Sequence, residues 1–423
     1  MSISHPLTYD AIIVGAGPNG LAAAITLART GRSVLVYEAK ATIGGGCRSA
    51  ELTLPGFTHD ICSAIHPFGV ASPFLHTVPL ARYGVEWLHP TIPLAHPFDD
   101  GTAAVLARSL DNTAASFGED ATAYTQLMQP LVKHWQTIIA ALYGPLRPLA
   151  IAAHPFKLAH FGLPALRSAH SLAQTHFKGS AAHALFAGLS AHSMLPLDVP
   201  STAAAGLLLS LLAHAVGWPM PRGGAHKIVD ALAAYLCDLG GKIVTGVEVT
   251  SLDMLPPARV VLCDITPRQL LRIAGKRLSR RYQRQLQHYR YGMGVFKLDL
   301  ALDGPIPWQA EACTQAGTVH VGGTLPEIAE AERAVWQGIH PKRPFVLLAQ
   351  QSLFDETRAP AGKQTVWAYC HVPHGSQSDM SERIEAQIER FAPGFRARIL
   401  ARHTTNTIEM EQYNANYIGG DIN

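Results

Sequence analysis

The sequence predicts an α/β protein in which a parallel sheet is joined by a helical region and a second, β-rich region. Three observations support this class: a strand, a glycine-rich turn and a helix near the N-terminus, a further helix and strand after residue 217, and alternating apolar residues after residue 285. The 423 residues, 48% of them hydrophobic and 15% charged, exclude a disordered, collagenous or coiled-coil protein. A formal net charge of +3 without a long run of basic residues gives no sign of nucleic-acid binding.

The first forty residues carry a nucleotide-binding pattern. An apolar strand at 11–14 runs into the turn Gly15-Ala16-Gly17-Pro18-Asn19-Gly20, and an apolar helix follows over 21–29. Gly15 permits the tight turn, Gly17 lets the backbone approach a pyrophosphate, and Gly20 lets the helix pack on the strand. The helix N-terminus then offers free N–H groups to the phosphates. The pattern predicts a Rossmann-like domain that binds FAD or NAD(P).

Two features after the turn narrow the choice of cofactor. Glu38 directly follows a second strand at 34–37, where a carboxylate accepts hydrogen bonds from the ribose hydroxyls and repels a 2′-phosphate. A second glycine cluster, Gly44-Gly45-Gly46, suits a backbone that passes close to a long, extended cofactor. Together they favour a long dinucleotide without a 2′-phosphate.

The residues from Gly15 to Glu38 and the Gly44-Gly45 pair resemble the N-terminal signature of the flavoproteins that include amine oxidases and carotenoid (phytoene) desaturases and isomerases. The stretch GGGCRSAELTLPGFTHDICSAIHP is similar to the phytoene-dehydrogenase-like oxidoreductases related to pyridine nucleotide-disulfide oxidoreductase domain-containing protein 2. This resemblance implies FAD as the cofactor. The residues expected to contact it are Gly15, Ala16, Gly17, Pro18, Asn19, Gly20, Glu38, Ala39, Gly44, Gly45, Gly46, Arg48 and Val249.

The same resemblance suggests a discontinuous FAD-binding domain. We expect its first part over 1–71, a mainly helical cap over 72–217, its second part over 218–285 and a β-rich substrate domain over 286–423. In the second part, a helix after Pro-Arg-Gly-Gly leads into a predicted strand at 242–252, whose Val249 would meet the adenine through its backbone. A strand ending at Leu262 then precedes Cys263-Asp264-Ile265-Thr266-Pro267.

Lys297 is the candidate catalytic residue. It lies on a predicted half-buried strand and is followed by Trp308, a pattern similar to amine oxidases, in which a strand lysine acts through water near flavin N5. A desolvated lysine could stabilise reduced flavin or activate dioxygen. The alternative is an edge-strand lysine that discourages aggregation.

Other candidate motifs favour structural roles. A dithiol relay beginning at Cys47 would place its partner at Leu52, so disulfide reduction is rejected and Cys47 is interpreted as a packing residue. The six cysteines and 21 histidines show no metal-ligand spacing, so no metal is expected. Asp99 and Asp100 precede Gly101 and predict a hairpin turn. The apolar run 202–216 is too short for a bilayer span and predicts a buried helix.

The predicted function is FAD-dependent transfer of a hydride from an apolar, isoprenoid or lipid-like small molecule to flavin, with oxygen or a quinone as electron acceptor. The alternatives are a flavin amine oxidase, a redox-neutral carotenoid isomerase, and a non-catalytic interaction protein that keeps the ADP-binding half of the site. The N-terminus has no signal-peptide pattern, which predicts a cytoplasmic protein. Peripheral contact with a membrane is a separate expectation. The sequence stops at Asn423 before the family's C-terminal PGGG-type run, so we expect a fragment or a shortened protein with weakened FAD binding.

Overall fold

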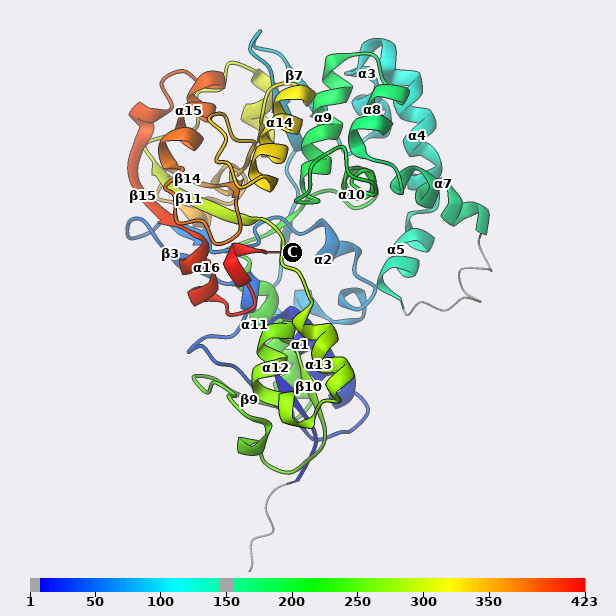
Figure 1. Ribbon diagram of the computed structural model, residues 1–423. Coiled ribbons are helices and arrows are strands. Elements are labelled where there is room, and N and C mark those ends of the chain that lie inside the picture. Colours follow the sequence, from blue (N-terminus) through cyan, green and yellow to red (C-terminus); the bar gives the residue numbers. More distant parts are fainter. Residues whose placement is uncertain (1–7, 145–154, 423) are drawn as a thin grey trace, which may run out of the picture.

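The computed structural model describes residues 8–144 and 155–422 and arranges them in three parts (Figure 1). A small parallel sheet with its helices lies at the bottom of the view, a large mixed sheet lies at the upper left, and helices fill the upper right. The predictions made from the N-terminal leader region and from Asn423 concern positions 1–7 and 423, which lie outside the described residues.

The small sheet brings together two segments that are far apart in the sequence. Its strand order is β10-β1-β2-β9, and every pairing is parallel. The strands are β1 (Tyr9–Val14), β2 (Val34–Tyr37), β9 (Lys242–Val244) and β10 (Ala258–Cys263). Helices α1 (Pro18–Ala28) and α11 (His226–Asp238) pack against each other and share one apolar core with β1 and β2. The Rossmann-like fold class is therefore confirmed.

The predicted strand at 242–252 is shorter than expected, because β9 ends at Val244. The chain then turns at Gly246, which has a positive φ of 71°. Val249 lies beyond this turn as a buried loop residue rather than as a strand residue. Three residues of β9 pair with β2, and beyond them Gly246 N and Val247 N donate to the carbonyls of Lys40 and Glu38 in the loop after β2.

The large sheet has seven strands in the order β15-β11-β14-β13-β12-β6-β7. They are β6 (Ile92–Pro97), β7 (Ala103–Leu106), β11 (Gly294–Leu302), β12 (Ala316–Val321), β13 (Val346–Ala349), β14 (Gln364–Val372) and β15 (Ile399–Thr405). Helix α15 (Ser381–Phe391) covers one face of this sheet. Alternate residues of β11 and β14 form an apolar core with the helix on that face. The opposite face looks toward the cap helices and the cofactor region.

Two of these strands, β6 and β7, lie in the segment 72–217, for which we expected helices and loops. β6 pairs in parallel with β12, more than two hundred residues away, and local sequence carries no trace of this partner. The Asp99-Asp100-Gly101 stretch joins β6 to β7 as the predicted hairpin turn, with the Asp100 carboxylate accepting a hydrogen bond from Thr102 N. Two further short pairs are β3 (Ser49–Glu51) with β4 (Thr58–Asp60) and β5 (Trp87–Leu88) with β8 (Met220–Pro221).

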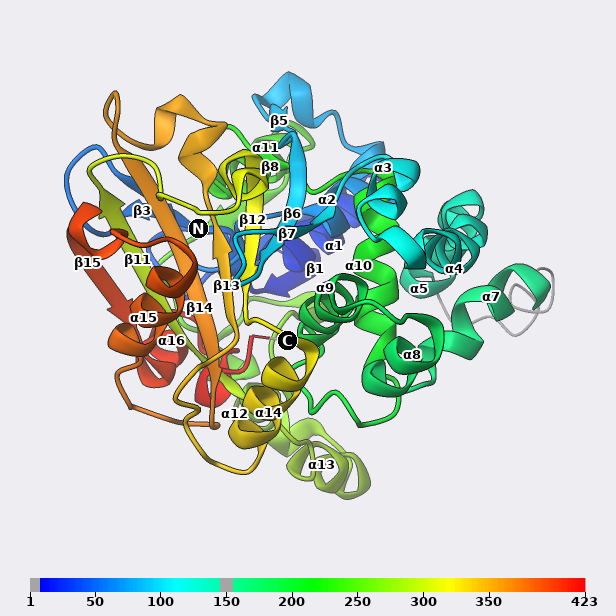
Figure 2. The same cartoon turned by 90° about the horizontal axis from the view of Figure 1, so that it is seen from above.

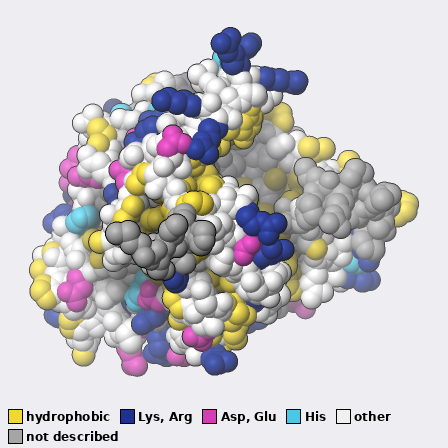
Figure 3. Space-filling view, turned by 90° about the horizontal axis from the view of Figure 1, so that it is seen from below, with side chains coloured by type: hydrophobic (Ala, Val, Ile, Leu, Met, Phe, Trp, Pro, Cys, Tyr) yellow, Lys and Arg dark blue, Asp and Glu magenta, His cyan; other side chains and the backbone are white. Residues whose placement is uncertain are grey.

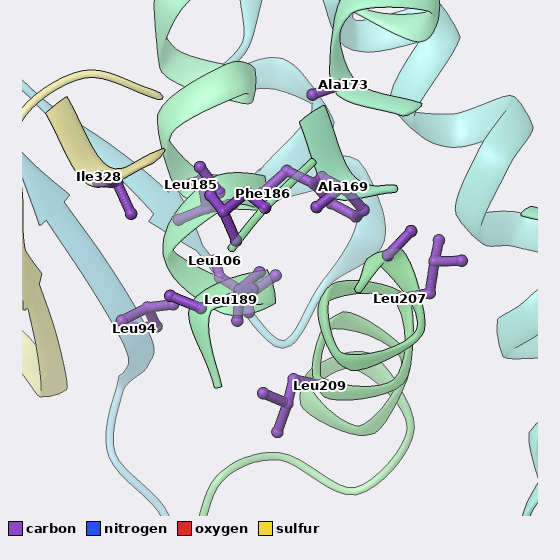
Figure 4. Close-up of a cluster of buried hydrophobic side chains, with 14 of the residues drawn as sticks. Leu94, Leu106, Ala169, Ala173, Leu185, Phe186, Leu189, Leu207, Leu209 and Ile328 are labelled. Atoms are coloured by element: carbon purple, nitrogen blue, oxygen red, sulfur yellow. The ribbon is translucent and has the colours of Figure 1, made fainter. Parts of the chain in front are cut away.

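The cap helices pack beyond the β6–β7 edge of the large sheet (Figure 2). The run 202–216 forms α10 and is a buried core helix, as predicted. Leu207 and Leu209 of α10 meet Leu185 and Leu189 of α9 and Leu94 of β6 in one apolar cluster (Figure 4). The helices of this region are α2 (Pro67–Ala71), α3 (Leu110–Ala115), α4 (Ala121–Lys133), α5 (Trp135–Tyr143), α7 (Pro155–Ala165), α8 (Ala169–His176), α9 (Ser180–Ala191) and α10 (Ala203–Ala215).

The remaining helices are α12 (Pro267–Ala274), α13 (Arg280–Gln287), α14 (Leu325–Trp336) and α16 (Thr407–Tyr413). On the face in Figure 3, Lys and Arg side chains are interspersed with acidic and apolar side chains. Within 8–144 and 155–422, no helix has the length and apolar character needed to cross a membrane.

Candidate cofactor site

The glycine turn after β1 adopts the conformation that its sequence predicts. Gly15 has a φ of 109°, which other residues rarely adopt. A Cβ built on Gly20 would lie 2.0 Å from the Gly15 carbonyl oxygen, so only glycine allows α1 to approach the end of β1 this closely. Gly17 is the N-cap of α1 and has no side-chain cap, and Gly17, Pro18 and Asn19 at this end of the helix line the chamber. Pro18 has no N–H group, and the Gly20 N–H donates to the Asp264 carboxylate.

Glu38 and Arg48 form a buried ion pair beside the turn. The Glu38 carboxylate accepts hydrogen bonds from Ala16 N at 3.1 Å and from Lys40 N at 2.9 Å, and Arg48 Nη2 donates to it at 3.2 Å. Arg48 also donates to the carbonyls of Thr42 and Ile43. Arg48 therefore orients Glu38 and holds the second glycine loop at the nucleotide end of the site.

The second glycine loop lies against the first. A Cβ on Gly45 would lie 3.2 Å from the Gly17 Cα, and one on Gly46 would lie 2.4 Å from the Tyr417 hydroxyl oxygen. Gly44 N donates to the Ala16 carbonyl at 2.9 Å, which ties the two loops together. Side chains at these positions would fill the passage between the nucleotide end and the centre of the molecule.

Two cavities meet at these glycine loops. A cleft of about 130 Å³ is lined by Gly15, Glu38, Ala39, Arg48 and Val249, among others. A chamber of about 510 Å³ is lined by Pro18, Asn19 and Gly46 and extends to the cap helices and the large sheet. The two cavities share a set of wall residues: Gly17, Gly45, Asp264, Asn414 and Asn416. One extended ligand could therefore occupy both.

The far wall of the chamber is mostly apolar and comes from distant elements. The cap supplies Met194, Leu209 and Trp218, and the large sheet supplies Leu347 and Trp367. Such a chamber suits an apolar ligand with few polar contacts.

His192 is a polar group in this wall that the sequence reasoning treated as an ordinary imidazole. Burial lowers its pKa to about 3, so its ring is neutral, and its Nε2 lies 3.1 Å from Nε2 of His320 on β12. The two histidines are far apart in the sequence, and no local pattern marks them as a pair.

Lys297 lies on β11, which is an interior strand between β14 and β15 and is buried over its whole length. The strand is therefore neither half-buried nor at an edge. The Lys297 ammonium pairs with the Asp299 carboxylate and lies 5.8 Å from the ring centre of Trp367. Among the described residues, the chamber wall includes Trp367 and Tyr369 but not Lys297.

The neighbours of Lys297 form a buried polar group behind the chamber wall. Burial raises the pKa of Asp299 to about 6 although Lys297 lowers it, and burial lowers the pKa of His59 to about 3. Trp308 belongs to the apolar core on the opposite face of the sheet and is not the tryptophan beside Lys297. The tryptophan that lies beside Lys297 is Trp367.

Cys47 and Cys62 both line the chamber, whereas Leu52 does not. Burial raises the pKa of Cys47 to about 11 and also raises that of Cys62, so both thiols stay protonated. Since the thiolate is the reactive form, these surroundings agree with packing roles. No group of three potential metal ligands occurs within the part of the chain that the structure describes.

The comparisons with known proteins agree with this geometry. The family of NAD(P)-binding Rossmann-like domains matches residues 13–78. A phytoene desaturase of Fusarium fujikuroi is 25% identical over 391 residues, which cover 86% of this chain and 66% of that protein. Pyridine nucleotide-disulfide oxidoreductase domain-containing protein 2 of Rattus norvegicus is 22% identical over 490 residues, covering 96% and 82%. This chain is related to the FAD-dependent oxidoreductases.

A solved structure of a putrescine oxidase variant has the same fold, with a TM-score of 0.61 and 18% identity over 96% of this chain and 86% of that one. The residues of the cleft fit the cofactor of this group. The glycine loops leave open a passage that side chains would narrow, the N-terminus of α1 lines it, and Glu38 lies at its nucleotide end.

Proposed function

We propose that the protein binds FAD in an extended form along the cleft and chamber and oxidises a small apolar molecule by hydride transfer to the flavin. The observation that carries this proposal is that the two cavities share Gly17 and Gly45 in their walls, with a nucleotide-binding turn at one end and an apolar chamber at the other. Bound FAD would supply the hydride acceptor.

The chain's own residues supply binding and orientation. The turn from Gly15 to Gly20 and the N-terminus of α1 would hold the pyrophosphate, and Glu38, oriented by Arg48, would hold the ribose. Val249 would contact the adenine. Met194, Leu209 and Trp218 would exclude water and hold the substrate.

The first test is the visible absorbance of the purified protein, before and after anaerobic reduction. We expect bands near ~375 and ~450 nm that bleach on reduction, and loss of both in Glu38→Ala, which removes the ribose acceptor and leaves Arg48 unpaired. Asp111→Asn, an exposed change on α3, is the matched control. A colourless protein that takes up no FAD would contradict the proposal. Stabilisation of such a protein by ADP would instead support a non-catalytic role.

The amine-oxidase alternative gives a prediction for Lys297, because its ammonium lies next to Trp367 in the chamber wall. If Lys297 assists reaction of the reduced flavin with oxygen, Lys297→Met slows reoxidation by at least about tenfold. Asp299 is expected to be protonated in this variant, since burial already raises its pKa. Stopped-flow mixing with oxygen measures the rate, and Lys363→Met, at an exposed ion pair, is the control. An unchanged rate would remove Lys297 from the mechanism and favour the desaturase or isomerase reaction.

Peripheral membrane contact stays a prediction. Exposed apolar side chains gather at the ends of α5 and α7, and Phe68, which lines the chamber, is also exposed. The exposed side chains at the ends of α5 and α7 are Leu142, Tyr143, Phe156, Leu163 and Leu166. An isoprenoid or lipid-like substrate could enter the chamber from this side, and oxygen or a quinone remains the proposed electron acceptor.

A further inference from the structure

The Asp264 carboxylate lies at the N-terminus of α1, where the proposed function places the pyrophosphate of the cofactor. It directly follows β10, and its carboxylate Oδ2 accepts a hydrogen bond of 2.8 Å from Gly20 N in the first turn of α1. A Cβ built on Gly17 would lie 3.6 Å from the same oxygen. Asp264 lines both the cleft and the chamber. The Asp264 carboxylate is thus an anion of the protein itself at the N-terminus of α1, where the helix dipole stabilises a negative charge.

The surroundings of Asp264 supply no cation to offset a second anion. Among the described residues, no Lys or Arg side chain forms an ion pair with it. Of the cations in the cleft wall, Arg48 is paired with Glu38, Arg272 with Glu248, and the Lys40 ammonium donates to the Gln412 carbonyl. The Asn416 amide donates to the Asp264 backbone carbonyl and leaves the carboxylate without a further donor from that side.

Burial raises the pKa of Asp264, the Gly20 N–H lowers it, and the Glu38 charge raises it, with a net increase. Four tyrosine and cysteine side chains in the walls of the two cavities, and Cys263 beside Asp264, also have raised pKa values. Burial raises the pKa of Tyr413, Tyr417, Cys47, Cys62 and Cys263, so these groups stay protonated.

We propose that the Asp264 carboxylate competes with the pyrophosphate of the cofactor for the N-terminus of α1 and thereby makes cofactor affinity depend on pH. This inference rests on the proposed function, because it takes the same cleft as the cofactor site. A bound pyrophosphate is a second anion beside Asp264, so binding favours the protonated carboxyl and takes up a proton. The affinity for the cofactor is therefore highest at acid pH and falls as the pH rises. It stops falling once Asp264 is ionised both in the free protein and in the complex.

The matched variant is Asp264→Asn, which removes the charge and keeps an oxygen that accepts the hydrogen bond from Gly20 N. The probe is ADP-ribose, whose pyrophosphate keeps its charge across the range, and binding to flavin-free protein is measured by calorimetry. As the pH rises from acid to about pH 8, we expect at least about tenfold loss of affinity in the unchanged protein. Asp264→Asn should bind about tenfold tighter at the upper pH and show little dependence on pH.

Two controls separate the charge effect from structural change. Adenosine lacks the pyrophosphate, so its affinity should be equal in the unchanged protein and in Asp264→Asn. Asp111→Asn, an exposed change on α3, should behave as the unchanged protein does. Calorimetry of the unchanged protein in two buffers of different ionisation enthalpy should show proton uptake with ADP-ribose, which tests the inference even if the variant does not fold.

If the affinity for ADP-ribose is independent of pH, the role of Asp264 is overturned while the proposed cofactor site stands. The same holds if Asp264→Asn and the unchanged protein bind ADP-ribose equally well. Absence of binding to every variant at every pH overturns the proposed cofactor site and this inference together.

Discussion

Replacement of Arg358 by methionine is expected to lower the free energy of unfolding by about 3–5 kcal/mol. Arg358 is fully buried and donates to Asp355 at 2.9 Å and to Asp60 at 3.1 Å. Asp60 also accepts from Ala225 N at 2.7 Å, and Asp355 accepts from Gly223 N at 2.6 Å. The network joins β4, the start of α11 and the loop before β14, so the variant leaves two buried carboxylates without their cation at the junction of the sheets.

The stability that Arg358→Met loses should be larger near neutral pH than in acid. Burial alone would raise the pKa of Asp60 and of Asp355, but hydrogen bonds and the Arg358 charge lower both below their ordinary values. Carboxyl groups with lowered pKa values stabilise the folded state above the unfolded pKa, and this contribution is lost as the pH falls through the folded pKa. Without Arg358 the contribution disappears, so the difference between variant and unchanged protein should be largest near neutral pH and shrink in acid.

Urea unfolding followed by tryptophan fluorescence measures this difference. The matched control is Arg277→Met, which breaks an exposed ion pair with Asp253 and should change the free energy of unfolding far less, because water and salt screen exposed charges. Equal losses in the two variants would show that the buried network contributes no more than a surface pair.

Replacement of Gly20 by alanine is expected to weaken binding of FAD and ADP-ribose by on the order of 100-fold, which corresponds to about 2.7 kcal/mol. The added Cβ would lie 2.0 Å from the Gly15 carbonyl oxygen and 3.1 Å from Asp264 Oδ2. Since the Gly15 carbonyl cannot yield without moving β1 or α1, the turn must open. A shift of about 1 Å at such a site is enough to remove the hydrogen bonds that hold a phosphate.

The control for Gly20→Ala is Gly31→Ala, just beyond α1. Gly31 has a φ of 75° and open space around its Cα, so alanine there adds backbone strain of about 1–2 kcal/mol without a clash in the cleft. Calorimetry should show unchanged binding in Gly31→Ala and weak binding in Gly20→Ala, with thermal melting as a check that both are folded. Binding by Gly20→Ala as tight as that of the unchanged protein would exclude the turn from the cofactor site.

The parts of the fold that sequence reasoning predicted depend on residues close together in the chain. The turn from Gly15 to Gly20 is one such part, because its φ values and close contacts restrict each position to a few residue types. Glu38 follows from the strand before it, and α10 follows from its continuous apolar composition.

The parts that were missed depend on partners distant in sequence. β6 becomes a strand by pairing with β12, and Lys297 becomes an interior residue because β15, formed about a hundred residues later, adds to its open side. His192 enters the chamber through the packing of α9 and lies beside His320. Asp264 could have been found, since it stands at the carboxyl end of a parallel strand, where ligands of open α/β sheets bind.

By itself, the sequence determined the nucleotide-binding end of this protein, because a tight glycine turn, the helix that starts from it and a carboxylate after a strand are local arrangements of backbone and side chain. Tertiary structure alone decided what lies around the reactive end of the cofactor. The chamber is assembled from the glycine loops, the cap and the large sheet, and its electrostatics depend on burial and on pairs such as Lys297 with Asp299. These contacts form only after long loops have closed, so no short stretch of sequence encodes them.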